Sequence, residues 1–274
     1  MKTQILVLLL LCSTSLLAQH EPREYIQLSN ISYLNDTTKA DAYQQSRCKL
    51  DIYYPTDTNG FATVIWFHGG SLQEGEKYIP AQLQDQQIAI VSVNYRLNPK
   101  VQSPAYINDA AAAVGWVYRH IAQYGGSTQK IFLSGHSAGG YLTLMLGLDP
   151  KYLAHEGIST SQLAGIIPFS GQTLTHLTIR EERKLAPTQL VADSMAPIYH
   201  TAKGFPPTIL ITGDREFEIP CRYEENALLC AQLRFVNPRH VKLYELKGFD
   251  HGTMVAPACL LLLHQIHAIL SQKP

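Results

Sequence analysis

Residues 131–140 read IFLSGHSAGG, an apolar run followed at once by the pattern Gly-x-Ser-x-Gly. The apolar residues 131–133 predict a buried strand, and residues 141–148 predict the beginning of a helix. A serine on a sharp turn between a strand and a helix exposes its hydroxyl for attack on a carbonyl carbon. Glycines at 135 and 139 suit such a turn, because larger side chains would collide with the neighbouring strand or helix. We therefore predict that Ser137 is a nucleophile.

Two other segments favour this interpretation over a glycine-rich turn that only happens to contain a serine. Residues 63–71, TVIWFHGGS, form an apolar run that ends in His-Gly-Gly. Residues 248–252, GFDHG, place His251 in a loop after a predicted strand. A serine hydroxyl needs a base within hydrogen-bonding distance, and among the eleven histidines we take His251 as that base. We expect His68 to brace its loop and His136 to make local packing or hydrogen-bond contacts.

The order of the predicted elements indicates an α/β fold. The 274 residues, 46% of them hydrophobic, suffice for one large domain with a sizeable core. The expected strands lie at residues 48–55, 62–67, 88–94, 131–133, 163–169, 207–212 and 241–246, and the expected helices at 81–86, 107–123, 141–148, 223–233 and 258–271. Alternating strands and helices predict a mostly parallel sheet with helices on both faces. The functional loops of such a sheet lie beyond the carboxyl ends of its strands, so one edge can gather them.

The beginning of the chain has the pattern of a secretory signal peptide. Lys2 precedes the apolar residues 5–11, and a stretch of small residues allows cleavage after Ala18. The apolar run is too short and interrupted to span a bilayer. Cys12 follows a run of leucines rather than the small residue that precedes a lipidated cysteine. We expect residues 1–18 to be a signal peptide, residues 19–274 a single domain, and the mature protein to be secreted or periplasmic.

Composition argues against several other classes of protein. The formal net charge is zero and there is no long charge run, which gives no support to nucleic-acid or anionic-membrane binding. There is no HExxH, GxGxxG or clustered carboxylate loop, so we expect no metal and no cofactor. Four cysteines follow Ala18 without Cys-x-x-Cys spacing, and their pairing cannot be read from the sequence. We take buried free thiols as the default.

The motifs together resemble the α/β-hydrolase superfamily. Along the chain, the motifs occur in the order HGGS, NYRL (residues 94–97), a predicted helix that includes Pro104, Asp109 and Trp116, GHSAGG, GDRE and DHG. More narrowly, the chain is similar to esterases and lipases related to hormone-sensitive lipase and to the bifunctional feruloyl and acetyl xylan esterases. The resemblance covers roughly residues 48–270 and implies a serine hydrolase that cleaves carboxylic esters through an acyl-enzyme.

The third member of the expected triad comes from the loop GDREFEIP at residues 213–220. Its position agrees with the chain order serine, acid, histidine of the superfamily. Asp214 is one candidate, because aspartate is the commoner acid. Related loops often read Gly-Asp-x-Asp-x-x-Val-Pro with the second acid catalytic, and aligning them on Ile219-Pro220 implies Glu216, with Asp214 as the alternate acid. We expect Glu218 to be solvated.

The expected oxyanion donors are backbone N–H groups. The resemblance implies Ala138, directly after the nucleophile, together with Gly69 and Gly70 of the His-Gly-Gly segment. Ser71 stands where the common form of this motif has a third glycine.

We expect a secreted serine esterase that removes short acyl groups. Acetyl or feruloyl groups on carbohydrate are the candidate substrates, and residues 171–206 are interpreted as a short lid. A serine peptidase or amidase of the same fold, or a catalytically silent hydrolase fold used for binding, are the alternatives. The sequence does not indicate an oligomeric state.

Overall fold

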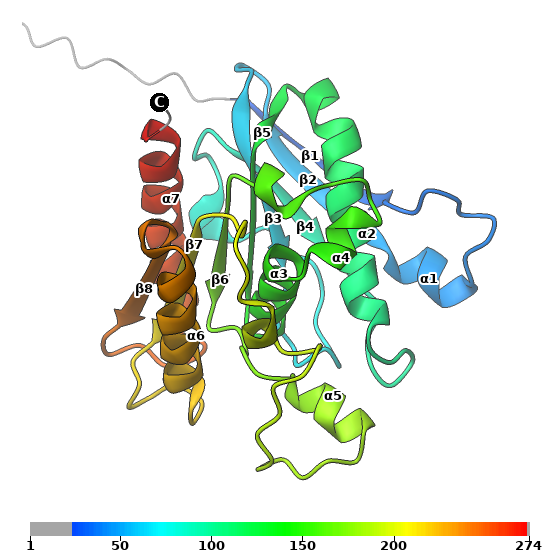
Figure 1. Ribbon diagram of the computed structural model, residues 1–274. Coiled ribbons are helices and arrows are strands. Elements are labelled where there is room, and N and C mark those ends of the chain that lie inside the picture. Colours follow the sequence, from blue (N-terminus) through cyan, green and yellow to red (C-terminus); the bar gives the residue numbers. More distant parts are fainter. Residues whose placement is uncertain (1–23, 273–274) are drawn as a thin grey trace, which may run out of the picture.

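An eight-stranded sheet forms the centre of the molecule, in the order β1-β2-β4-β3-β5-β6-β7-β8 (Figure 1). The computed structural model describes residues 24–272, so the signal-peptide prediction and Cys12 lie outside the described residues. The strands are β1 (Tyr25–Ser32), β2 (Lys49–Pro55), β3 (Phe61–Phe67), β4 (Ala89–Val93), β5 (Gly126–His136), β6 (Gly165–Phe169), β7 (Thr208–Gly213) and β8 (Val241–Leu246). The pairs β1–β2 and β2–β4 are antiparallel and all other pairs are parallel. The predicted α/β fold with a mostly parallel sheet is confirmed.

Helices cover both faces of the sheet. They are α1 (Ala42–Arg47), α2 (Ala105–His120), α3 (Ala138–Leu148), α4 (Pro150–Ala154), α5 (Leu177–Glu182), α6 (Arg222–Val236) and α7 (Val255–Ser271). Buried side chains of α2, α3 and α6 share one hydrophobic core with the sheet, and α7 packs in a second core on the opposite face. Every residue of β3, β4 and β6 is buried, as their continuous apolar sequences require.

The structure differs from the predicted elements in several places, and the short helices α1, α4 and α5 were not predicted. Residues 81–86 form only a short 3-10 turn, Ala81–Leu83, because Asp85 adopts a left-handed backbone conformation that a helix cannot contain. Strand β1 was not expected, and most of its side chains, including Ile26 and Leu28, are exposed. It pairs with β2 at one edge of the sheet.

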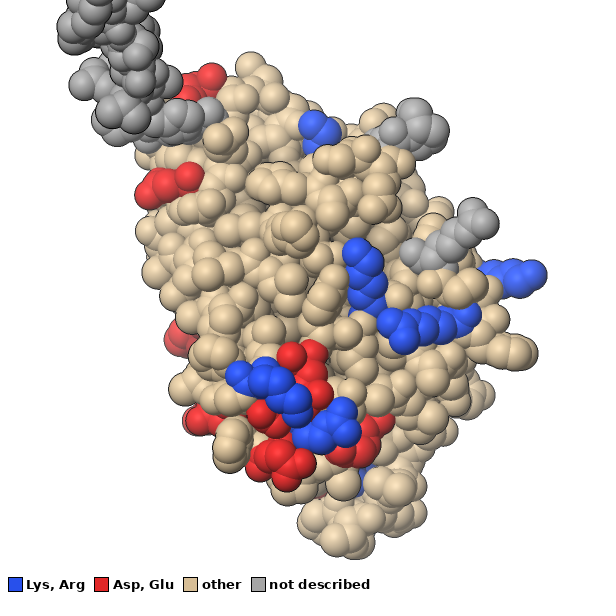
Figure 2. Space-filling model, turned by 90° about the vertical axis from the view of Figure 1, so that its left-hand side faces the viewer, with Lys and Arg blue, Asp and Glu red and all other residues tan. Residues whose placement is uncertain are grey.

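The other edge of the sheet, at β8, carries paired charges. Glu245 binds both Arg215 and Lys247, and Lys247 also lies 3.5 Å from Asp214. Figure 2 shows charged side chains of both signs gathered on this side of the molecule. Charge at an edge strand disfavours pairing with another strand.

Within residues 24–272, no helix combines the length and the apolar character that crossing a bilayer requires. Four cysteines of the described part of the chain are free, and of these Cys221 is exposed rather than buried as we had expected.

Candidate active site

Ser137 occupies the predicted turn between strand and helix. It follows β5, precedes α3, and has φ 56° and ψ −114°, a conformation that costs energy for a residue with a side chain. The glycines on either side explain how the turn is tolerated. A Cβ on Gly139 would lie 1.9 Å from the carbonyl oxygen of Phe67, and one on Gly135 would lie 2.5 Å from the same atom. Close packing of the turn against β3 thus requires glycine at both positions.

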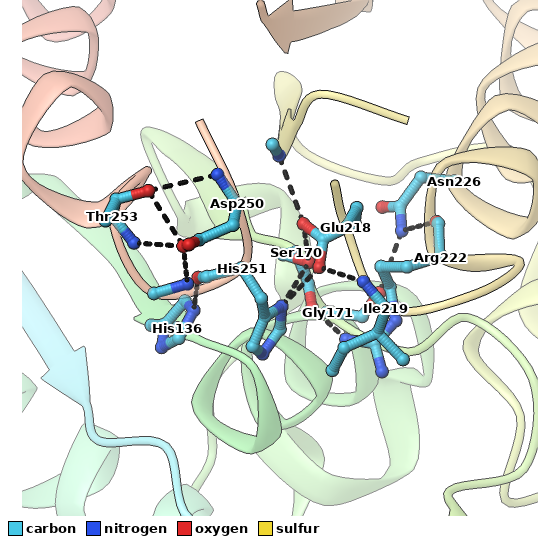
Figure 3. Close-up of polar contacts among 12 residues, drawn as sticks. His136, Ser170, Gly171, Glu218, Ile219, Arg222, Asn226, Asp250, His251 and Thr253 are labelled. Carbon is cyan, nitrogen blue, oxygen red and sulfur yellow. Dashed lines mark hydrogen bonds and ion pairs between the residues drawn. The ribbon is translucent and has the colours of Figure 1, made fainter. Parts of the chain in front are cut away.

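His251 lies in the loop after β8, which is fixed by its own side-chain contacts. The carboxylate of Asp250 accepts hydrogen bonds from the backbone N–H groups of Gly252 and Thr253 and from the hydroxyl of Thr253. The backbone oxygen of His251 accepts a hydrogen bond from Nε2 of His136, at 2.8 Å, and the two rings lie 4.6 Å apart. The residue directly before Ser137 therefore holds the His251 loop beside the turn (Figure 3). His136 makes the local hydrogen bond expected of it.

The partner of His251 is Glu218 rather than Glu216. Glu218 Oε1 lies 2.5 Å from Nδ1 of His251, and only 1% of the Glu218 side chain is exposed (Figure 3). Burial alone would raise the pKa of Glu218, but the contact with His251 and hydrogen bonds from Ile219 and Ser170 lower it to about 2. The carboxylate is thus ionised at neutral pH and can only accept, so Nδ1 of His251 donates to it.

The expectation that Glu218 is solvated is wrong, and the position of Glu216 gives no support to its assignment as the catalytic acid. Glu216 is exposed, and Glu218, which we expected to be solvated, is buried. The reason is a helical turn in which the backbone N–H groups of residues 217 and 218 both donate to the carbonyl of Asp214, at 2.9 and 2.8 Å. Asp214, the alternate acid, instead accepts hydrogen bonds from the backbone N–H groups of Glu216 and Gly248, and so ties the two loops together.

The His-Gly-Gly loop lies against the nucleophile. A Cβ on Gly69 would lie 3.3 Å from the carbonyl oxygen of His136 and 3.4 Å from Cβ of Ser137, so this loop lies next to the turn that carries the serine. Ala138 opens α3 directly after the serine. Gly70 has φ 105°, and its carbonyl accepts hydrogen bonds from the backbone N–H groups of residues 73 and 74. The assignment of Ala138, Gly69 and Gly70 as oxyanion donors stays a prediction.

Buried side chains support this loop from behind. The ring of His68 stacks on Tyr95 at 4.4 Å, and the Tyr95 hydroxyl donates to the His68 carbonyl at 2.8 Å. Burial lowers the pKa of His68 to about 4, so its neutral Nε2 can accept from Arg47, whose guanidinium nitrogen lies 3.2 Å away. His68 braces its loop as expected.

Residues 171–206 lie against the same group of loops. The hydroxyl of Thr178 donates to the carbonyl of Ser71 at 2.5 Å, and Glu182 accepts hydrogen bonds from Asn98 and from the backbone of Ser103. These contacts join α5 to the segments that follow β3 and β4. The interpretation of residues 171–206 as a lid stays a prediction.

Two residues of the site were missed by the sequence analysis. Ser170, directly after β6, contacts both Glu218 and His251, and Arg222 at the start of α6 donates to the Ser170 carbonyl. Neither lies in a motif, and their contacts join elements that only the sheet topology brings together.

A comparison with known proteins fits this geometry. The BD-FAE family model matches residues 50–231. The chain belongs to the BD-FAE family. This confirms the resemblance to the esterases and lipases of the α/β-hydrolase superfamily.

Characterised relatives are esterases of greater length. The chain is 27% identical over 240 residues to Esterase LipC of Mycobacterium tuberculosis, covering 76% of this chain and 57% of that protein. It is 28% identical over 206 residues to the isoprenylcysteine alpha-carbonyl methylesterase ICME of Arabidopsis thaliana, covering 65% of this chain and 48% of that one. The chain thus spans about half the length of these curated relatives.

Solved esterase structures share the fold over nearly the whole chain. The propionate-bound esterase 2 of Thermogutta terrifontis superposes with a TM-score of 0.69 at 22% identity, covering 92% of this chain and 96% of that one. A truncated carbohydrate esterase from gut microbiota superposes with a TM-score of 0.68 at 17% identity, and the match covers 92% of this chain and 99% of that one. These matches show that this chain has an α/β-hydrolase fold.

Proposed function

We propose that this protein is a serine carboxylesterase with Ser137 as nucleophile, His251 as base and Glu218 as the orienting acid. The observation that carries the proposal is the pair of His251 with the buried Glu218, held by His136 beside a serine on a strained turn. Membership of the BD-FAE family and the esterase relatives support it.

The geometry gives each residue a chemical task. Glu218 fixes the Nδ1 proton, so Nε2 of His251 can accept the proton of the Ser137 hydroxyl as its oxygen attacks the ester carbonyl. The backbone N–H groups of Ala138, Gly69 and Gly70 would stabilise the oxyanion. His251 then gives the proton to the departing alcohol. In the second half of the reaction, His251 again acts as the base while water attacks the acyl-enzyme.

We propose that the substrate is a carbohydrate that carries a short acyl group, acetyl or feruloyl, in ester linkage. Its support is the resemblance of the motif set and the likeness in fold to a carbohydrate esterase from gut microbiota. We also propose that residues 1–18 are a signal peptide and that the mature protein is secreted or periplasmic.

The test is hydrolysis of p-nitrophenyl acetate by residues 19–274 and by Ser137→Ala. We expect turnover by the wild-type protein and loss of it in the variant, together with labelling of Ser137 by a fluorophosphonate. A folded protein whose Ser137 does not react would indicate a silent binding fold instead. Faster turnover of aminoacyl p-nitroanilides than of esters would indicate an amidase, and a panel with acetylated xylan and feruloyl esters would define the acyl group.

A further inference from the structure

Ser170 has a position fixed from several sides. It follows the last residue of β6, is fully buried, and has φ 47°. Its backbone N–H donates to the carbonyl of Ile211 in β7 at 2.7 Å, and its carbonyl accepts from the guanidinium of Arg222. The backbone at Ser170 is therefore anchored to β7 and α6 independently of what its side chain contacts.

The hydroxyl of Ser170 contacts both members of the acid–base pair. Oγ lies 2.8 Å from Oε2 of Glu218 and 3.1 Å from Nδ1 of His251 (Figure 3). An ionised carboxylate can only accept, so the single hydroxyl proton goes to Oε2. A lone pair of Oγ then faces the Nδ1–H group, whose proton is shared between Glu218 Oε1 and Ser170 Oγ.

These contacts complete the hydrogen bonding of the Glu218 carboxylate. Oε1 accepts from Nδ1 of His251 at 2.5 Å and from the backbone of Ile219 at 2.9 Å. Oε2 accepts from Ser170 and from the backbone of Gly213 at 3.1 Å. Without the Ser170 hydroxyl, Oε2 would keep one long bond. A glutamate has one more rotatable bond than an aspartate, so its carboxylate needs more contacts to stay in one orientation.

We propose that Ser170 is a positioning residue of the esterase reaction, which holds the Glu218 carboxylate and the Nδ1 side of His251 so that Nε2 faces Ser137. The inference rests on the proposed function and adds a residue to it. Ser170 acts through Glu218 and His251 and touches no substrate atom in this scheme.

The first test is Ser170→Gly, because glycine adopts a φ of 47° without strain and removes only the hydroxymethyl group. We expect kcat for p-nitrophenyl acetate to fall about 10- to 100-fold, as for loss of one hydrogen bond to a charged group, with KM within about twofold of wild type. The melting temperature should stay near that of the wild type. Ser170→Ala, which keeps Cβ, should show the same loss of kcat. A wild-type kcat in folded Ser170→Gly would overturn the proposal.

The second test asks whether Ser170 acts through Glu218. In a Glu218→Ala background, Ser170→Gly should lower kcat by a clearly smaller factor than in the wild type, because one of the two groups that Ser170 holds is already absent. A full additive loss in the double variant would contradict the proposal. Inactive wild-type protein would end both this inference and the proposed function, whereas an active wild type with an equally active Ser170→Gly would end this inference alone.

Discussion

Glu216 and Glu218 are two positions apart, yet only one reaches His251. The helical turn over residues 214–218 turns the first outward and buries the second. We predict that Glu218→Gln lowers kcat for p-nitrophenyl acetate by about 10³- to 10⁴-fold, since an amide does not stabilise the imidazolium and permits the wrong tautomer. The matched change Glu216→Gln should stay within about twofold of wild type. The reverse ranking of the two variants would return the assignment to Glu216.

The sequence could place Ser137 on a turn between a strand and a helix, and His251 in a loop after a strand, because each lies in a motif next to a strand signal. It could not choose the acid, because three carboxylates share one short loop and its backbone turn decides which of them points inward. Alignment on Ile219-Pro220 compared spacing along the chain, and spacing does not include the direction of a side chain.

The glycine at 139 should be the least replaceable residue of the turn. In Gly139→Ala the new Cβ would meet the Phe67 carbonyl oxygen at 1.9 Å, and backbone in a central strand cannot move aside. We expect a loss of at least about 2 kcal/mol in the free energy of unfolding, measured by urea denaturation. Gly252→Ala is the control, because there the nearest atom lies 3.7 Å from the new Cβ and the stability should be nearly unchanged. Equal stability of both variants would contradict this account of the turn.

At the scale of elements, the central strands were predictable and the peripheral ones were not. Strands β3, β4 and β6 are apolar on both faces, which gives a continuous signal in the sequence. Strand β1 and the short helix α5 depend on tertiary contacts instead. The hydrogen bond between Thr178 and Ser71 joins α5 to a loop 107 residues earlier in the chain. A contact over this separation cannot be predicted from a local sequence pattern.

The Asn-Tyr-Arg-Leu motif is a structural link between two elements. Arg96, after β4, makes two side-chain hydrogen bonds to Asp109 of α2, at 2.8 and 2.7 Å, and its backbone N–H donates to the same carboxylate. Because Asp109 is 3% exposed and makes three hydrogen bonds with the half-buried Arg96, we predict that Asp109→Ala costs about 2–3 kcal/mol of unfolding free energy. Lys39→Ala, which breaks the exposed pair with Asp36, should cost less than about 1 kcal/mol. Chemical denaturation of both would check the contrast, and similar losses would show that Asp109 has no special structural role.

At the scale of the whole molecule, the buried His68 and His176 and the half-buried His136 make the fold sensitive to acid. Burial is the main cause that lowers the pKa of His68 and His136 to about 4 and that of His176 to about 3, against 6.5 for the free side chain. Between about pH 6.5 and pH 4, these histidines therefore bind protons in the unfolded chain but not in the folded chain. Their contribution to stability is complete above about pH 6.5 and is lost progressively as the pH falls toward 4.

His176 allows this to be measured one group at a time. It lies before α5, where its neutral Nδ1 accepts from the backbone of Thr178 at 3.2 Å, and asparagine can fill the same N-cap without titrating. We predict that in His176→Asn the slope of unfolding free energy against pH, between pH 6 and 4, is smaller by about 1.4 kcal/mol per pH unit. Urea denaturation of the wild type and the variant across this range gives both slopes. Parallel slopes would mean that His176 takes up its proton in the folded state, and that the acid sensitivity has its origin in other groups.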